Sequence, residues 1–344
     1  MSKSVLVIGG GISGIKAAES LGRLGVETIL VERTDKLGGT FEKLGSTFPY
    51  GVDAKTSLDK YLQNLRSLQN VKIHTNTRVK SVAKTDDGFE VTFDPNGSSL
   101  NVGAVIVATG YTPFNATRIP SYGYGKYKNV ITSLELVRMF RNDQTITRPS
   151  DNIPPKSITF ITCVGSRDKK TNEYCSSFCC TYTVHLARML KEIDENFDVT
   201  IMYMDMRTFS NYEALFQEAR AMGIKFLRGK PSMVFEKSNN QQLTVQVENT
   251  ITREFLHYKA DLVVLSIGAE PADGCDELGR IFGIKRDERT GFFKTAEEDD
   301  VAAVGQERVF IAGNASGPKD TQYSLAQASA AAMKALISIG GLDS

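Results

Sequence analysis

Cysteine is scarce in this sequence, which has five among 344 residues. A small and odd number of cysteines argues against a framework of disulfides, so apolar packing has to build the core. No apolar run approaches the roughly 18 residues of a membrane-spanning helix. The apolar stretch Val5–Ile8 breaks at once into glycines and does not resemble a secretory leader. We therefore expect a cytoplasmic protein without direct membrane insertion, whose thiols stay reduced.

An excess of charge of either sign is also lacking. The 41 basic and 40 acidic residues leave a net charge of +1, and no basic run interrupts this balance. Nucleic-acid-binding proteins concentrate basic residues on one face, so no nucleic-acid partner is expected. The composition, with 41% hydrophobic and 24% charged residues, is that of an ordinary globular protein, and the length suits about two domains.

The order of apolar segments predicts an α/β fold. Short apolar runs bounded by glycine or polar residues indicate strands, and longer amphipathic stretches indicate helices. The first part predicts a helix at 15–25 and strands at 4–8, 26–32, 71–75, 79–84, 89–93 and 104–110. A second pattern predicts helices at 177–193 and 212–222 and strands at 157–162, 199–206, 223–227, 242–247, 255–258 and 260–268. A strand at 309–313 and a helix at 324–337 come last.

These patterns predict one α/β domain interrupted by another. We assign residues 1–115 and 291–344 to a dinucleotide-binding domain and residues 155–290 to an inserted α/β unit. Residues 116–154 form a connector around one short helix, expected at 133–140.

Gly9, Gly11 and Gly14 form the pattern G-x-G-x-x-G between a predicted strand and a predicted helix. The first glycine permits a tight turn, the second lets the backbone approach a pyrophosphate, and the third lets helix and strand pack closely. Glu32 closes the next strand, 18 residues after Gly14, where a carboxylate can accept hydrogen bonds from ribose hydroxyls. Together they predict a dinucleotide site at the helix N-terminus.

Three further segments resemble the FAD domain of flavoproteins that contain two dinucleotide-binding domains. They are Gly38–Gly39, Val107–Gly110 and the late segment from Val309. The resemblance implies a Rossmann-like FAD domain with an inserted second α/β domain, and FAD as cofactor. In those proteins the late motif ends in Gly-Asp, whereas Asn314 stands at the acid's place; an amide can still hydrogen-bond a hydroxyl. The flavin contacts that we expect are Gly9, Gly11, Ser13, Gly14, Glu32, Arg33, Gly38, Gly39, Thr40, Val79, Ala108, Thr109, Gly110, Gly313, Asn314, Lys319, Asp320 and Ser324.

Two features of nicotinamide-dependent relatives are missing. The segment Thr162–Asp168, where a second glycine loop would be expected, contains Gly165 alone, so NAD(P)H as direct reductant is disfavoured. Arg167 could hold a phosphate, but an ion pair or a solvated loop explains it as well. The early segment Gly39–Tyr50 carries no cysteine pair, which argues against a disulfide reductase of the familiar layout.

Four of the five cysteines gather in the second part of the chain. Cys163, Cys175, Cys179 and Cys180 give the spacing C-x11-C-x3-C-C. Four thiolates are the usual ligands of a 4Fe–4S cluster or a structural zinc ion, and the adjacent pair is awkward for zinc. Redox-active thiols and inert buried thiols are the remaining interpretations. Cys275, far along the chain, is expected to be a packed or surface thiol and no ligand.

Four segments together resemble the family formed by the A subunits of heterodisulfide reductase. They are CVGSRD from Cys163, YCSSFCC from Tyr174, YGYGKYKNVITSLE from Tyr122 and GPKDTQYSLAQA from Gly317. The resemblance implies that Cys163, Cys175, Cys179 and Cys180 bind a 4Fe–4S cluster near the flavin, and that Lys319 lies by the isoalloxazine ring. A cation there stabilises reduced flavin. The further cysteine clusters of the methanogen form are missing, which argues against electron bifurcation.

We therefore expect a flavin and iron–sulfur electron-transfer subunit. The short form resembles the A subunit of the heterodisulfide-reductase-like complex of sulfur-oxidising bacteria and archaea. Other subunits of such a complex and a second copy of the chain are the expected partners. The alternatives are the A subunit of the quinone-interacting oxidoreductase of sulfate metabolism, a stand-alone FAD-dependent NAD(P)H oxidoreductase with zinc, and a non-enzymatic scaffold. His74, His185 and His257 are expected to be structural.

Overall fold

The computed structural model describes residues 3–47, 51–142, 145–236, 241–297 and 299–341. The chain divides into two compact units. Unit 1 comprises Met1–Glu42, Ala54–Thr112 and Glu270–Ser344, and unit 2 comprises Lys43–Asp53 and Pro113–Ala269. Strands β10 (Tyr111–Pro113) and β19 (Ala269–Pro271) form a short two-stranded ladder.

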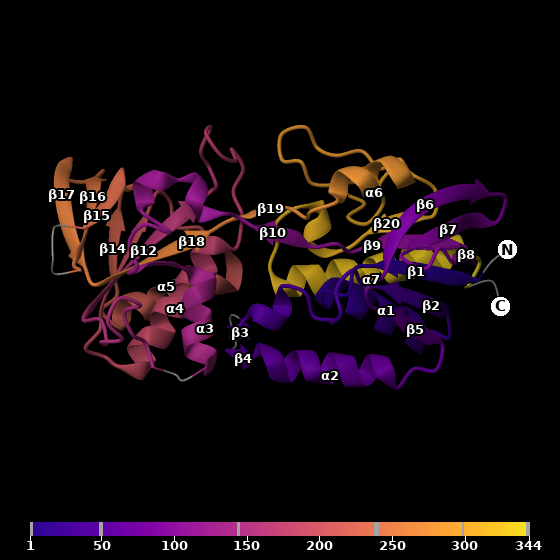
Figure 1. Ribbon diagram of the computed structural model, residues 1–344, viewed down its shortest axis with the longest axis horizontal. Coiled ribbons are helices and arrows are strands. Elements are labelled where there is room, and N and C mark those ends of the chain that lie inside the picture. The colour runs from indigo at the N-terminus through magenta and orange to yellow at the C-terminus, as the bar shows by residue number, and fades with distance from the viewer. Residues whose placement is uncertain (1–2, 48–50, 143–144, 237–240, 298, 342–344) are drawn as a thin grey trace. The chain divides into compact units, whose positions relative to one another are not determined.

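Unit 1 is built on a parallel sheet with the strand order β20-β9-β1-β2-β5 (Figure 1). Strands β1, β9 and β20 are buried on both faces, as expected of a parallel sheet, whereas the edge strand β5 is partly exposed. Ile8 lies opposite both Val31 and Val107, and Val107 lies opposite Ile311, so these strands end at one edge. The strands are β1 (Ser4–Ile8), β2 (Glu27–Val31), β5 (Val71–His74), β9 (Ala104–Val107) and β20 (Val309–Ile311).

Two layers cover this sheet. Leu6 and Ile8 point into a core shared with the antiparallel sheet β6-β7-β8 and helix α6, and the other face is packed by α1 and α7. The bounds of these elements are β6 (Arg78–Thr85), β7 (Gly88–Asp94), β8 (Ser99–Val102), α1 (Ile12–Arg23), α6 (Cys275–Phe282) and α7 (Thr321–Ser338). The other helical elements of the same chain segments are α2 (Ala54–Arg66), η1 (Phe41–Lys43) and η5 (Gly313–Ser316).

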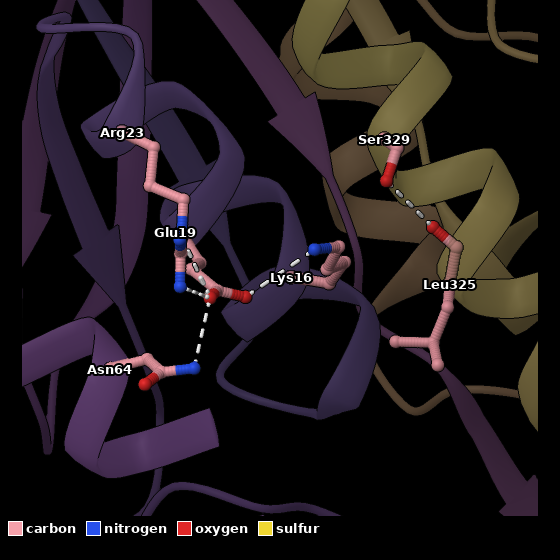
Figure 2. A network of polar contacts seen from close by, with 6 residues as sticks. All are labelled: Lys16, Glu19, Arg23, Asn64, Leu325 and Ser329. Atoms are coloured by element: carbon pink, nitrogen blue, oxygen red, sulfur yellow. Dashed lines mark hydrogen bonds and ion pairs between the residues drawn. The ribbon is translucent and has the colours of Figure 1, made fainter. Parts of the chain in front are cut away.

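Glu19 is a buried carboxylate on α1, 2% exposed, and Figure 2 shows how it is satisfied. Oε1 accepts hydrogen bonds from Nη2 of Arg23 at 2.8 Å and from Nδ2 of Asn64 on α2 at 3.2 Å. Oε2 is 3.4 Å from Nζ of Lys16. A buried charge is tolerated when it is paired in this way, and the contacts fix α2 against α1. On α7, Oγ of Ser329 donates to the carbonyl of Leu325 at 3.2 Å (Figure 2).

Unit 2 has a second parallel sheet with the order β11-β18-β12-β13-β14. Strands β12, β13 and β14 follow one another through helices α4 and α5, whereas β18, the other neighbour of β12, comes much later in the chain. The carboxyl end of β12 therefore lies at a topological switch point, where ligands bind in open α/β sheets. The strands are β11 (Val130–Thr132), β12 (Ser157–Val164), β13 (Asp198–Tyr203), β14 (Lys225–Arg228) and β18 (Leu262–Ile267).

The remaining elements of unit 2 close its two cores. Helices α3, α4 and α5 pack on one face of the sheet, and the antiparallel sheet β15-β16-β17 packs on the other. Their bounds are α3 (Ser133–Asn142), α4 (Cys179–Ile193), α5 (Glu213–Ala221), β3 (Ser46–Thr47), β4 (Val52–Asp53), β15 (Met233–Glu236), β16 (Leu243–Asn249), β17 (Glu254–Ala260), η2 (Ala116–Arg118), η3 (Pro120–Tyr122) and η4 (Ser210–Tyr212).

The boundaries of the units differ from the expected domain boundaries in three places. Residues 116–154, expected as a connector, lie within unit 2, because β11 adds to the edge of β18. Residues 270–290 lie with unit 1, because α6 packs against β6 in its core. Lys43–Asp53 belongs to unit 2.

Candidate functional site

The glycine loop of unit 1 has the close packing that its spacing predicts. A Cβ on Gly14 would lie 1.8 Å from the carbonyl oxygen of Gly9, and a Cβ on Gly9 would lie 2.5 Å from that of Ala108. Gly9 has φ +108, a backbone conformation that residues other than glycine rarely adopt. Gly11 differs, because no atom of the described residues lies within 4 Å of a Cβ built on it. The loop is therefore tightly packed against the protein at Gly9 and Gly14, whereas there is open space beside Gly11.

Glu32 follows the end of β2 and is buried beside this loop. Its Oε2 accepts a hydrogen bond from the backbone N–H of Gly10 at 2.7 Å, and its Oε1 accepts one from the N–H of Thr34 at 2.8 Å. The N–H of Gly38 donates to the carbonyl of Gly10 at 2.8 Å. Gly10 was not among the expected residues, although its place between Gly9 and Gly11 marks it. The acid thus orders the loop that it adjoins.

A second loop, residues 313–320, follows β20 at the same edge of the sheet. A Cβ on Gly313 would lie 2.0 Å from Oγ of Ser13, so this late loop packs against the start of α1. Nζ of Lys319 donates to Gly313 O at 2.8 Å, to Ser316 Oγ at 3.0 Å and to Gly317 O at 2.7 Å. Burial lowers the pKa of Lys319 to about 8, while these three acceptors favour its charged form.

The other predicted residues of the late loop have structural partners. Oδ1 of Asn314 accepts the N–H of Lys319 at 2.8 Å. Asp320 is the N-cap of α7, and its side chain accepts the N–H of Tyr323 at 2.9 Å, as expected of a capping aspartate. Ser324 is buried in the first turn of α7, close to Gly313.

The remaining predicted flavin residues divide into two groups. Ala108 and Thr109 contact the glycine loop through Gly9, and Gly110 turns the chain with φ +71. Gly39 lies close to Gly11, because a Cβ built on Gly39 would lie 3.2 Å from Cα of Gly11. Gly38 forms an isolated β-bridge with Gly11. The others have different surroundings: the side chain of Val79 lies in the core of unit 1, Nη1 of Arg33 donates to the carbonyl of Asp273 at 3.0 Å, and Thr40 is partly exposed.

In unit 2, Cys163, Cys179 and Cys180 pack together as a buried group, which we term the thiol cluster. Cys163 lies at the carboxyl end of β12, and the other two open α4. Tyr182, Met204 and Met206 cover the group. Cys175 is only partly buried, and its Sγ accepts the N–H of Ser177 at 3.3 Å. The structure therefore gathers three of the four predicted ligands.

The backbone around the thiol cluster is held in unusual conformations. Cys163, Arg167 and Ser177 have φ of +58, +56 and +57, a region in which non-glycine residues are uncommon. The register of β12 against β18 shifts between Ile161 and Val164, which includes Cys163. Such conformations cost on the order of 1–3 kcal/mol each and gather at functional sites. They turn the chain at the switch point of the sheet.

The three clustered thiols differ in acidity because they share hydrogen bonds. A hydrogen bond from Cys179, together with Thr162 and the charge of Arg167, lowers the pKa of Cys163 to about 6 against the opposing effect of burial. The pKa of Cys179 is raised well above its usual value by its hydrogen bonds to Cys163 and Cys180 and by burial. The hydrogen bond from Cys179 lowers the pKa of Cys180. Thiolate character, which metal binding requires, is thus favoured at Cys163 and Cys180.

The donor set suits iron or zinc in its chemistry, because both are bound by cysteine thiolates. The arrangement of these side chains does not suit either metal, because no group of three or more His, Cys, Asp or Glu side chains in the described ranges has the geometry of a metal-ion site. Cys163, Cys179 and Cys180 pack together without forming such a group, and Cys175 lies outside the thiol cluster. Binding of a four-thiolate group would require the segment around Cys175 to move inward.

An ion pair occupies the region where a nicotinamide dinucleotide would be expected. Nη2 of Arg167 is 2.6 Å from Oδ2 of Asp205, which follows β13, and Nη2 of Arg228 is 3.3 Å from Oδ1. In dinucleotide-binding folds the acid after the second strand accepts ribose hydroxyls. Here that carboxylate is engaged by two guanidinium groups. The ion-pair interpretation of Arg167 is thus confirmed. Asp205 was not among the predicted site residues, because the apolar pattern placed it inside a strand expected at 199–206, whereas β13 ends at Tyr203.

The histidines and the fifth cysteine are placed apart from these groups. Nε2 of His185 lies 2.6 Å from Oγ of Ser46, and burial, with a smaller contribution from Arg188, lowers the pKa of His185 to about 4. Cys275 is a packed thiol at the start of α6 in unit 1, as expected. Within the part of the chain that the structure describes, none of the helices has the length and apolar character needed to cross a bilayer.

Comparison with known proteins gives related chains over nearly the whole length. Residues 1–123 match the family described as pyridine nucleotide-disulphide oxidoreductase. The A subunit of the H(2)/formate:CoB-CoM heterodisulfide,ferredoxin reductase of Methanococcus maripaludis is 33% identical over 96% of this chain and 63% of its own length. The iron-sulfur A subunit of the CoB–CoM heterodisulfide reductase of Methanocaldococcus jannaschii is 33% identical over 96% of this chain and 64% of its own.

The chain thus spans somewhat less than two thirds of the relatives it matches. The alignments extend over 420 positions, more than the 344 residues of this chain, so the relatives carry additional residues within the aligned region.

Solved structures support the two-unit fold. Thioredoxin reductase of T. acidophilum superposes with a TM-score of 0.65 at 17% identity, covering 98% of both chains. That of Lactococcus lactis superposes with a TM-score of 0.67 at 18% identity, covering 99% of this chain and 100% of its own. The expected α/β fold with two dinucleotide-binding-type domains is confirmed.

Proposed function

We propose that the chain, which is similar to the A subunits of heterodisulfide reductase, is an oxidoreductase, namely the flavin- and iron–sulfur-containing electron-transfer subunit of a heterodisulfide-reductase-like complex. The observation that carries this proposal is the thiol cluster at the switch point of unit 2, where a nicotinamide-binding fold has its glycine loop. When bound, FAD exchanges two electrons and a 4Fe–4S cluster carries one at a time.

Unit 1 is proposed to bind FAD at the edge of its sheet. Gly11 leaves open space before the N-terminus of α1, where backbone N–H groups favour a pyrophosphate. Glu32 is held in place by its hydrogen bond from the N–H of Gly10, and its carboxylate can accept hydrogen bonds from ribose hydroxyls. Lys319 provides a partly buried cation, which would stabilise negative charge on a reduced flavin. All the flavin contacts predicted from the sequence, those at the glycine loop as well as Val79, Arg33 and Thr40, remain proposals.

Unit 2 is proposed to hold the iron–sulfur group through Cys163, Cys175, Cys179 and Cys180. The thiol cluster supplies three buried sulfurs, and two residues after Cys163 the turn passes Gly165, which packs against the ring of Phe114. The N-terminus of α4 begins at Cys179, and the partial positive charge there favours thiolates. Cys175 would join the other three by movement of its partly exposed segment.

Direct reduction by NAD(P)H is a second candidate function that the residues of unit 2 disfavour. Asp205 is engaged by Arg167 and Arg228, and Cys163 lies where the backbone would have to approach a pyrophosphate. For the chain to be a zinc-containing NAD(P)H oxidoreductase, the ion pairs of Asp205 would have to break and the backbone at Cys163 would have to move.

The biological setting is proposed from homology and sequence resemblance. We place the chain in cytoplasmic sulfur oxidation, with other subunits of the complex and a second copy of itself as partners. The A subunit of a quinone-interacting oxidoreductase of sulfate metabolism is the alternative setting.

Stepwise anaerobic reduction tests the proposed chemistry. The purified protein, with flavin and iron quantified, is titrated with dithionite, NADH and NADPH while its visible spectrum is recorded. Dithionite should bleach the flavin and then a broad iron–sulfur absorption, and neither nicotinamide should react rapidly. Rapid bleaching by NADH or NADPH would overturn the proposal, as would flavin that stays oxidised under dithionite.

A further inference from the structure

Three segments of unit 2 follow neighbouring strands of its parallel sheet. They are residues 165–178 after β12, residues 204–212 after β13 and residues 228–232 at the end of β14. Strands β12, β13 and β14 pair in parallel, so their carboxyl ends lie at one edge of the sheet. We term the surface formed by these three segments the carboxyl edge. Met204 and Met206 of the second segment pack against the thiol cluster, which therefore lies beneath this surface.

Ion pairs join the three segments into one surface. Nη2 of Arg167 is 2.6 Å from Oδ2 of Asp205, and Nη2 of Arg228 is 3.3 Å from Oδ1 of the same aspartate. Lys230 forms a further ion pair with Asp168. Each pair links one segment to another, and together they neutralise two carboxylates of the carboxyl edge.

The carboxyl edge is more basic than the chain as a whole. Its segments carry six basic and three acidic residues, whereas the whole chain carries 41 and 40. The basic residues are Arg167, Lys169, Lys170, Arg207, Arg228 and Lys230, and the acidic residues are Asp168, Glu173 and Asp205. Lys169, Lys170 and Arg207 are exposed. A local excess of positive charge attracts a partner of negative charge and accelerates its association.

Apolar side chains are exposed on the same surface. Phe209 is 48% exposed in the second segment, and the two methionines over the thiol cluster are partly exposed. The hairpin between β16 and β17 adjoins the third segment, because the N–H of Thr250 donates to the carbonyl of Arg228 at 2.8 Å. The next residue of that hairpin, Ile251, is 69% exposed. Aromatic, methionine and arginine side chains are enriched at protein–protein interfaces, and methionine adapts its shape to a partner.

We propose that the carboxyl edge of unit 2 is the docking surface for a partner protein whose own docking face is acidic around an apolar centre. This inference rests on the proposed function in one respect, that the chain is a subunit of a complex, and it requires no cofactor in unit 2. Arg207, Lys169 and Lys170 attract the partner, and Phe209 packs against its apolar centre. Charges at the rim of an interface act mainly on the association rate, whereas apolar contacts at its centre act on the dissociation rate.

An acidic protein suits this surface better than a nucleic acid does. The chain has a net charge of only +1, and acidic residues lie among the basic ones of the carboxyl edge. Surfaces that bind nucleic acids concentrate basic residues on one face.

The first part of the test locates the partner on the chain. The full chain is expressed with an affinity tag in its source organism, and the proteins that remain bound at low salt are identified by mass spectrometry. A carbodiimide, which joins lysine amines directly to carboxylates, is then added to the purified complex. We expect cross-links from Lys169, Lys170 or Lys230 to carboxylates of the partner. The control is Lys156, an exposed residue directly before β12 and hence at the opposite edge of the sheet, which should form none.

The second part measures the binding of the purified partner to variants of the full chain. Arg207→Glu should lower the association rate by about tenfold at low salt, with a smaller difference at high salt, because salt screens exposed charges. Phe209→Ser should raise the dissociation rate by about tenfold. The matched controls Lys156→Glu and Ile153→Ser should bind as the wild type does, because both residues precede β12 and Ile153 is 53% exposed.

The outcomes separate this inference from the proposed function. A chain that carries no partner protein overturns the proposed function and this inference with it. A partner that binds Arg207→Glu and Phe209→Ser as tightly as it binds the wild type overturns the docking surface and leaves the proposed function standing. Binding that nuclease treatment abolishes would show a nucleic acid at this surface and would likewise overturn the inference.

Discussion

Gly14 lies directly against Gly9, with the carbonyl oxygen of Gly9 only 1.8 Å from the position of a Cβ on Gly14. Gly14→Ala therefore forces α1 away from the end of β1, and we expect it to destabilise the protein by about 2–4 kcal/mol, as overpacking and backbone shifts do. The free energy of unfolding, measured by urea denaturation, checks this.

Gly11→Ala is the matched change at the open side of the same loop. The backbone there has φ −74, which alanine accepts, and a Cβ meets no described atom within 4 Å. We expect nearly unchanged stability but at least tenfold weaker FAD binding, because the methyl group occupies the space proposed for the pyrophosphate. Flavin retention after gel filtration and titration of the apoprotein with FAD measure it. Equal FAD affinity in this variant and the wild type would contradict the proposed flavin site.

Lys319→Met removes a partly buried cation and three hydrogen bonds of the late loop. If this cation stabilises reduced flavin, the two-electron flavin potential should fall by about 30 mV or more, which corresponds to roughly a tenfold change in the equilibrium constant. Lys334→Met is the control, because Lys334 lies on α7 and pairs with Asp300 at 2.6 Å. A spectroelectrochemical titration that gives both variants the wild-type potential would leave Lys319 with a structural role only.

The buried His185 predicts a dependence of stability on pH. Its pKa is about 4 in the folded protein, below the value of 6.5 of an unperturbed histidine, because burial and Arg188 disfavour its charged form. Between these values the unfolded chain binds a proton that the folded chain does not. Stability therefore falls as the pH decreases from 6.5 to 4, by a histidine contribution on the order of 3 kcal/mol.

His185→Gln should lose this contribution, so the difference in unfolding free energy between wild type and variant should shrink from pH 7 to pH 4. Comparing the two proteins cancels the effect of the carboxylates, which titrate in the same range. A constant difference for His185→Gln would show that the pKa of its imidazole is the same in the folded and unfolded states, which would contradict the prediction.

Single Cys→Ala changes test the ligand set. Changes at Cys163, Cys175, Cys179 or Cys180 should each reduce the iron content to less than half, whereas Cys275→Ala should leave it intact and cost about 1 kcal/mol for the small cavity in its core. Cys175→Ala is the most informative variant, because that thiol lies outside the thiol cluster. Full iron content in Cys175→Ala would reduce the site to three cysteine ligands.

Local sequence signals were sufficient where one segment determines its own geometry. The pattern of three glycines between an apolar run and an amphipathic stretch predicted β1, the loop and α1, although the helix begins at Ile12, earlier than expected. Helix α2 was missed because only Ala54, Leu58 and Leu65 of its side chains are buried, which leaves a thin apolar pattern. Strand β8 was missed because it is short and only Val102 of its residues is buried.

Features that depend on contacts between distant segments could not be predicted in the same way. Cysteine spacing suggested one group of four thiols, but whether Cys175 reaches the others depends on the turn between Arg167 and Ser177, whose positive φ values no local pattern reveals. The ion pair of Arg167 with Asp205 joins residues 38 positions apart. The register between β12 and β13 determines that they meet.

Metal, sulfide and flavin analysis of protein purified without oxygen, together with an electron paramagnetic resonance spectrum after reduction, tests the central claim most directly. We expect iron and acid-labile sulfide in equal amounts, about four of each per chain as in a 4Fe–4S cluster, with FAD bound and a paramagnetic signal upon reduction. Protein that retains FAD but contains no sulfide, or contains zinc in place of iron, would contradict it.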